Sequence, residues 1–103
     1  MFFQAGGVVL AIYQREKLAE DAVVAPEGGG FAGFTLAYNA QSEAKVDEII
    51  ANLKSKGVTI VKEPQKVFWG GYSSYFADPD GFLWEVAYNP FFPFDENGNL
   101  KLG

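Results

Sequence analysis

The chain contains no histidine and no cysteine, and these two absences narrow the chemistry open to it. Without cysteine there are no disulfides, no thiolate nucleophiles and no thiolate metal sites. Without histidine the commonest general base and the commonest metal ligand are missing, and a serine triad in its usual form is excluded. Any chemistry performed by this chain therefore has to use carboxylates, hydroxyls, amides and lysine.

Basic residues and long apolar segments are also scarce. Eight Lys and Arg stand against thirteen Asp and Glu, which gives a net charge of −5. Nucleic acids and anionic membranes both require a basic face, so neither is expected as a partner. No apolar run approaches the ~20 residues that span a bilayer, and the opening MFFQAGG lacks the basic flank of a signal peptide. We expect a cytoplasmic protein.

Aromatic residues, in contrast, are abundant. They make up 17% of the 103 residues and include ten Phe. A chain of this length is expected to form a single domain, residues 1–103, and so small a domain hides only ~60–70% of the surface of its unfolded chain. Part of this apolar surface is therefore expected to face a ligand cavity or a second subunit.

The spacing of apolar residues predicts one helix among several strands. In residues 42–56, apolar side chains recur at i, i+3, i+4 and i+7, with Ser42 as a candidate N-cap and Gly57 at the position where a helix stops. Strands are predicted on either side of this helix, at 34–39, 58–63, 71–77 and 82–88, the last two joined by the turn Asp-Pro-Asp-Gly.

The first third of the chain is predicted to be less regular. Residues 1–13 favour two strands joined near Gly6 and Gly7, and residues 15–22 favour a short surface helix. The glycine run at 27–30 lacks the Lys and Ser/Thr of a phosphate loop, so we interpret it as a linker. The apolar tail after residue 89 is expected to fold back over the domain or onto a partner.

A strand, a helix and three strands, closed by Asp-Pro-Asp-Gly, then Glu85 and Asn89-Pro90, resemble the second half of a vicinal oxygen chelate domain. This superfamily includes glyoxalase I, bleomycin-resistance proteins and extradiol dioxygenases. The resemblance covers residues 33–90, and residues 2–13 are similar to the last two strands of the first half. It implies an α+β fold, a glyoxalase-like βαβββ unit plus a β-hairpin remnant of a second unit in a curled mixed sheet. The opening strand and helix of the family domain are absent, so the domain is interpreted as N-terminally truncated.

The resemblance places Glu85 at the family's final metal-ligand position, in a cup formed by the sheets. Alternation along 82–88 places Glu85 on the face away from the helix. If Ala77 pairs with Phe82, Ser74 lies opposite Glu85 and Tyr72 opposite Ala87. The predicted ligand-binding residues are Glu85, Tyr72, Ser74, Trp69 and Thr35. The simpler alternatives are a solvated acid, ordinary sheet packing of the hydroxyl residues, and a core or rim position for Trp69.

The other positions of the family's metal site carry no strong ligand. An internal similarity between residues 2–14 and 75–89 places Leu10 where the second half has Glu85, and Thr35 or Phe34 occupies the place where the family often has His. One exposed carboxylate does not offset the cost of dehydrating a divalent ion. No cofactor is therefore expected, with Mg²⁺, Mn²⁺ or Zn²⁺ at Glu85 as the alternative.

The sequence thus favours a binder of a small apolar or aromatic molecule, as in the bleomycin-resistance branch. The main alternative is a divalent-metal lyase, isomerase, dioxygenase or thiol transferase assembled at a homodimer interface, so whether the chain is an enzyme stays open. A third alternative is a domain whose exposed face only binds a partner chain. A homodimer is expected in any case, because an incomplete sheet leaves an open edge and an uncovered apolar face.

Overall fold

A four-stranded mixed sheet is the centre of the structure, a computed structural model that describes residues 2–5, 8–27 and 31–101. The strand order is β3–β6–β5–β4; β3 runs parallel to β6, and the other neighbours are antiparallel. The bounds are β3 Leu36–Asn39, β4 Thr59–Lys66, β5 Tyr72–Ala77 and β6 Leu83–Tyr88. Two further strands, β1 Phe2–Ala5 and β2 Val8–Ala11, form an antiparallel hairpin of their own. The α+β fold with a βαβββ unit and a hairpin is therefore confirmed.

Helix α2, Glu43–Ser55, forms where the apolar spacing predicts it. The Ser42 hydroxyl accepts a hydrogen bond from the Lys45 N–H at 3.1 Å, which satisfies one of the N–H groups left free at a helix start. Val46 and Ile50 are buried against Val86 of the sheet. The face covered by α2 is called the outer face below, and the opposite face, which carries Glu85, the inner face.

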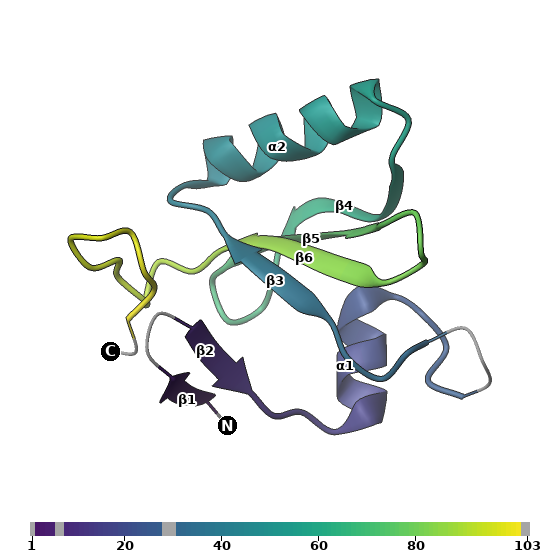
Figure 1. Ribbon diagram of the computed structural model, residues 1–103, viewed down its shortest axis with the longest axis horizontal. Helices are drawn as coiled ribbons and strands as arrows, with labels where there is room; N and C mark the ends of the chain where they lie inside the picture. The colour runs from purple at the N-terminus through teal and green to yellow at the C-terminus, as the bar shows by residue number, and fades with distance from the viewer. Residues whose placement is uncertain (1, 6–7, 28–30, 102–103) are drawn as a thin grey trace.

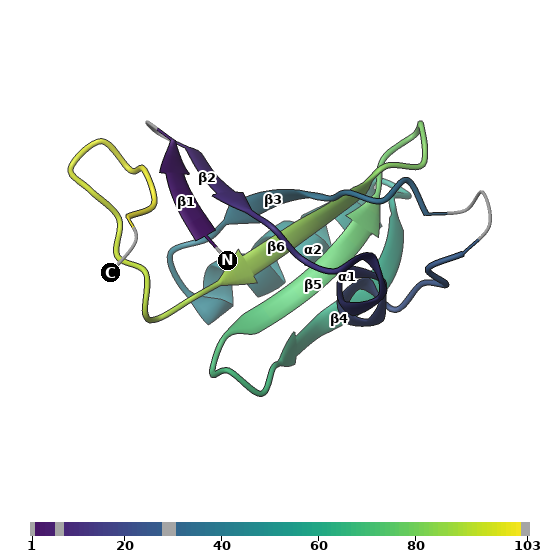
Figure 2. The same cartoon turned by 90° about the horizontal axis from the view of Figure 1, so that it is seen from below.

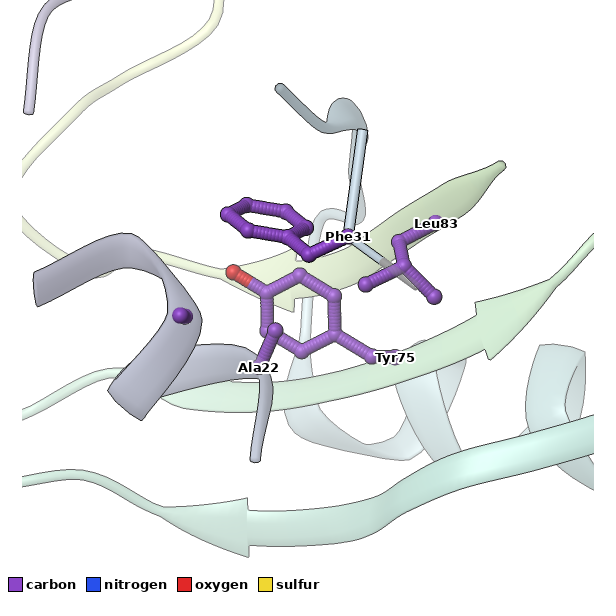
Figure 3. Close-up of a cluster of buried hydrophobic side chains, with 5 residues drawn as sticks. Ala22, Phe31, Tyr75 and Leu83 are labelled. Atoms are coloured by element: carbon purple, nitrogen blue, oxygen red, sulfur yellow. The ribbon is translucent and has the colours of Figure 1, made fainter. Parts of the chain in front are cut away.

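Helix α1, Arg15–Ala22, has the predicted bounds but not the predicted surface position. It lies on the inner face, on the side of the sheet opposite α2 (Figures 1 and 2). Ala19 and Ala22 are fully buried there, and they pack in one cluster with Phe31 and Tyr75 (Figure 3). The side chain of alanine ends at Cβ, so this helix can approach the strands closely. Both faces of the sheet are therefore covered within one chain, at least in part.

The hairpin between β5 and β6 has a different register from the predicted one. Ala77 pairs with Leu83 rather than Phe82, because the Asp78 N–H donates to the Phe82 carbonyl at 2.9 Å and leaves a three-residue loop. Gly81, at a φ of 85°, supplies the left-handed residue that such a loop requires. The resulting shift of one residue exchanges the two faces of β5.

The C-terminal tail folds back onto the β1–β2 hairpin, as predicted. The rings of Phe2 and Phe92 meet edge to face at 5.5 Å, and the Gln4 side-chain amide donates to the Leu100 carbonyl at 3.1 Å. The predicted linker at 27–30 and the Gly6–Gly7 turn lie mostly outside the described residues. Among the helices that the structure describes, none combines the length and apolar character needed to cross a bilayer.

Candidate functional site

Glu85 lies in the middle of β6 on the inner face, as the alternation of the strand predicts. Its side chain is partly buried, and the Ser73 hydroxyl donates a hydrogen bond of 2.8 Å to its Oε2. Burial raises the pKa of Glu85 above its usual value; the hydrogen bond from Ser73 counteracts part of this rise, and the Asp21 carboxylate adds to it. Glu85 is therefore a carboxyl that retains its proton more readily than a solvated one.

A row of paired residues crosses the sheet at Glu85. Lys62 of β4 pairs with Tyr75 of β5, Tyr75 pairs with Glu85 of β6, and Glu85 pairs with Ala37 of β3. Residues directly opposite one another in a sheet point to the same face, so an ammonium, a phenol and a carboxyl lie side by side. The inner face thus carries its polar groups in one line perpendicular to the strands.

Helix α1 adds a second carboxylate to this row. The Tyr75 hydroxyl donates to Asp21 Oδ2 at 2.7 Å, and Lys62 Nζ lies 3.7 Å from Asp21 Oδ1. Tyr13 precedes the same helix and is about half exposed; its partial burial, together with the charges of Glu85 and Asp21, raises its pKa. These groups form one inner-face cluster, contributed by the segment before α1 and by α1, β4, β5 and β6: Tyr13, Asp21, Lys62, Ser73, Tyr75 and Glu85.

Tyr72 and Ser74, both predicted to line the cup with Glu85, lie on the outer face, and this part of the prediction is wrong. The Tyr72 hydroxyl donates to Asp47 of α2 at 2.7 Å, and the Ser74 hydroxyl donates to the Val86 carbonyl at 2.7 Å. The one-residue difference in register is the cause. Ser73 and Tyr75 occupy the places beside Glu85 instead.

Two other predicted residues lie outside the cluster. Thr35 is partly buried just before β3, and alternation assigns it to the face of Ala37. Trp69 lies in the loop between β4 and β5, where its indole covers Gly71 so closely that any side chain at Gly71 would collide with it. Their roles in ligand binding stay predictions.

Five members of the cluster, Tyr13 among them, were missed from the sequence. Ser73 and Tyr75 would follow from the correct hairpin register alone. Lys62 carries a weaker signal, a lysine between apolar residues of a predicted strand. No pattern pointed to Asp21, because it belongs to a helix that was expected at the surface.

The residues at the inner face do not fit a divalent metal ion. Among the described residues, no group of three His, Cys, Asp or Glu side chains is close enough together to hold one. Asp21 is already paired with Lys62 and Tyr75, so Glu85 is the carboxylate of the inner-face cluster that stays available to a metal ion. Leu10 is exposed on β2 and cannot ligate, and the Phe34 ring packs against Phe82. A hard divalent ion needs more oxygen donors than this face offers.

Two open concavities of about 440 Å³ each lie away from Glu85. One lies between the start of α2 and the C-terminal tail and is polar, with Ser42 and Phe94 on its walls. The other is apolar and lies between α2 and the sheet, with Ile49 and Trp84 on its walls. Because α1 occupies part of the inner face, the cluster forms a partly covered polar surface rather than a deep pocket.

Comparisons with known proteins agree with this fold. The model of the Glyoxalase/Bleomycin resistance protein/Dioxygenase superfamily matches residues 1–86. A glyoxalase-related enzyme from Fulvimarina pelagi is 32% identical, with a TM-score of 0.66, and the match covers 99% of this chain and 73% of that one. No curated protein matches the chain.

Two further solved structures match over shorter stretches. The fosfomycin resistance protein FosX from Listeria monocytogenes is 32% identical, with a TM-score of 0.51, over 59% of this chain and 50% of its own length. A family enzyme from Burkholderia phytofirmans, 20% identical with a TM-score of 0.54, covers 71% of this chain and 58% of its own and shows the fold alone. Fold, family model and the Fulvimarina relative agree: the chain belongs to the glyoxalase/bleomycin resistance protein/dioxygenase superfamily.

Proposed function

We propose that this chain binds a small apolar or aromatic molecule at the inner face of the sheet, with the Glu85 carboxyl as its polar anchor. The observation that carries the proposal is the position of Glu85: a partly buried carboxyl, held by Ser73 and directed away from α2. A carboxyl is costly to bury unless it makes good hydrogen bonds, so a residue of this kind is more typical of a site than of a core.

The surroundings of Glu85 support the proposed class of ligand. Leu83 and Ala87, its neighbours on the same face, are apolar, and the half-exposed Tyr13 lies close enough for the charge of Glu85 to affect its pKa, whereas Phe31 and α1 already cover Leu83 and Tyr75. Such walls favour an apolar or aromatic body, and Glu85 favours a hydroxyl, amide or amine on it. The superfamily name refers to resistance to bleomycin, which carries aromatic and amine groups and is therefore a reasonable first probe; fosfomycin, in the name of the Listeria relative, is a small anionic phosphonate and serves as the contrasting compound.

The test is titration calorimetry of the purified protein with bleomycin and with fosfomycin. Glu85→Gln should weaken binding by roughly tenfold to a hundredfold, the usual effect of losing a hydrogen bond to a charged group. Ser73→Ala should weaken it less, because only the orientation of Glu85 is lost.

Ser74→Ala is the matched control for this test. Ser73 and Ser74 are adjacent and both fully buried, but Ser74 faces α2 and bonds to the backbone. Its removal should reduce stability while the binding constant stays unchanged. Failure of bleomycin to bind, or an equal loss of affinity at Ser74, would contradict the proposal.

We propose further that the chain acts as a homodimer. Within the part of the chain that the structure describes, β3 is an edge strand, with β6 on one side and no strand on the other. Phe34, Leu36 and Tyr38 are exposed along this edge, and residues 34–39 carry no charge. Edge strands that stay unpaired usually carry charges or prolines, so this edge is suited to pairing with a second copy.

A further inference from the structure

Lys62 is a buried cation with few groups around it that can neutralise its charge. Its side chain is 6% exposed, and Nζ donates to the Asp21 carbonyl at 3.0 Å and lies 3.7 Å from Asp21 Oδ1. Nζ also lies 5.6 Å from the centre of the Tyr75 ring. An ammonium out of water is costly unless a negative group pairs with it. The Asp21 carboxylate therefore stabilises the buried ammonium of Lys62.

Tyr75 supplies a second donor to the same carboxylate. Its residue is 1% exposed, and its hydroxyl points toward α1 and donates to Asp21 Oδ2 at 2.7 Å (Figure 3). Burial, with the nearby charges of Glu85 and Asp21, raises the pKa of Tyr75 strongly, so the phenol keeps its proton and remains a donor. The two oxygens of Asp21 thus face different partners, one the ammonium and one the phenol.

The elements that carry the donors and the acceptor of this contact differ in how strongly they are held in the fold. Lys62 and Tyr75 are directly paired residues on neighbouring strands of the sheet. Asp21 belongs to an eight-residue helix whose fully buried contacts are two alanines, and its own side chain is 38% exposed. An isolated helix of this length is not stable in water, so its position depends on what it packs against. Lys62 and Tyr75 are thus held by the sheet, whereas the position of the Asp21 carboxylate depends on the docking of α1.

We propose that Lys62 and Tyr75 form a binding site for a carboxylate group, which Asp21 occupies as an internal ligand and which accepts a small carboxylic acid when Asp21 vacates it. This goes beyond the role proposed for Glu85, since Lys62 and Tyr75 make the site without it. Glu85 lies beside Tyr75 and carries the same charge as the ligand, so its ionised form opposes binding.

Removal of the internal carboxylate gives a direct test. Asp21→Ala should lower the midpoint of thermal unfolding, Tm, by roughly 10 °C, because it leaves a buried ammonium unpaired. Sodium acetate, titrated at constant ionic strength against chloride, should raise the Tm of this variant with saturation. At ten times its dissociation constant the rise should be roughly 5–10 °C. In the wild-type chain Asp21 already fills the site, and acetate should have no such effect.

Three controls separate a bound carboxylate from a general salt effect. Acetamide has the same shape without the charge and should not stabilise Asp21→Ala. Acetate should not stabilise Asp21→Ala combined with Lys62→Met, in which the cation is gone. Glu20→Ala removes the neighbouring, exposed acid of the same helix and should respond to acetate as the wild type does.

Two results would overturn the inference: no saturable effect of acetate on Asp21→Ala, or an equal effect on the variant that lacks Lys62. If Asp21→Ala is unfolded in chloride, far-UV circular dichroism during the acetate titration replaces Tm. Refolding then supports the site, and its absence overturns it. Adding Glu85→Gln to Asp21→Ala should leave the acetate effect intact or strengthen it. Failure of the Glu85 anchor and failure of the carboxylate site are thus separate outcomes.

Discussion

Glu85 is the acid of β6 at the inner face, and its pKa is raised. The groups that face it come from every element packed there: Tyr13 before α1, Asp21 on α1, Lys62 on β4, and Ser73 and Tyr75 on β5. Burial and Asp21 favour its neutral form, while Ser73 and Lys62 favour the ionised one. The net effect is a raised pKa, so the folded chain binds this proton more tightly than the unfolded chain does.

The raised pKa of Glu85 predicts a pH dependence of stability with a definite sign. Between the unfolded-state value of 4.5 and the higher folded-state value, the folded state binds more protons, so its free energy of unfolding decreases as pH rises. Glu85→Gln removes this decrease and should make the chain more stable than wild type at neutral pH. Urea unfolding of both proteins from pH 4 to 8 measures the difference.

The measurement has to compare wild type with Glu85→Gln, because other carboxyls change the free energy of unfolding with pH in the opposite direction. Hydrogen bonds lower the pKa of Asp78 and of Asp95, so their contribution is present above the unfolded-state pKa and is lost as pH falls through the folded-state pKa. These effects cancel between wild type and variant. Asn52→Ala, at an exposed position on α2, changes no titratable group and should show no pH-dependent difference. A gap between wild type and Glu85→Gln that stays constant with pH would refute the assignment.

At the scale of single elements, the start of α2 is fixed by one side chain. Ser42 has extended backbone geometry, and its hydroxyl accepts the Lys45 N–H. Ser42→Ala should therefore lower the free energy of unfolding by about 1 kcal/mol. Ser55→Ala is the control at the other end of the helix, where the hydroxyl only donates to the exposed Asn52 carbonyl, and it should change stability by less than about 0.5 kcal/mol. Equal losses in urea unfolding at the two positions would argue against a capping role.

The elements also differ in how far the sequence could predict them. Helix α2 has four apolar residues at helical spacing, a cap and a stop, and these agree with one another. The fully buried residues of helix α1 are Ala19 and Ala22, with Leu18 packed beside them, and alanine gives no strong apolar period that distinguishes a packed helix from an exposed one. The turn Asp-Pro-Asp-Gly predicts a hairpin, but not whether its loop has three or four residues. That single ambiguity decided which of Ser73 and Ser74 joins Glu85.

At the scale of the whole molecule, the residues that the structure describes form two small cores on opposite sides of one sheet. Val46, Ile50 and Val86 belong to the outer core, and Ala19 and Phe31 to the inner one. Much aromatic surface stays exposed around them, and part of it, Phe34 and Tyr38, lies along the β3 edge proposed to pair in a homodimer. The sequence predicted this exposed surface from the small size of the domain and its high aromatic content.

The homodimer proposal predicts a specific response to charge on β3. Sedimentation velocity of the wild-type chain should show a dimer at micromolar concentration. Leu36→Lys should shift the equilibrium toward monomer by at least about tenfold, because a lysine on the edge resists strand pairing. Phe68→Lys makes the same change at a fully exposed loop residue and should leave the dimer intact. A wild-type monomer, or equal effects of the two substitutions, would contradict pairing through β3.

Val23 at the end of α1 affects the balance between a docked and a released helix. It is a β-branched residue with a φ of 61°, in the left-handed region that such side chains avoid at a cost of about 1–2 kcal/mol. Detachment of α1 from the sheet would let Val23 relax and recover this energy. Val23 makes no bond to Asp21, Lys62 or Tyr75. Its strain would nevertheless raise the population of chains with α1 detached roughly tenfold, compared with a chain that has an unstrained glycine at position 23.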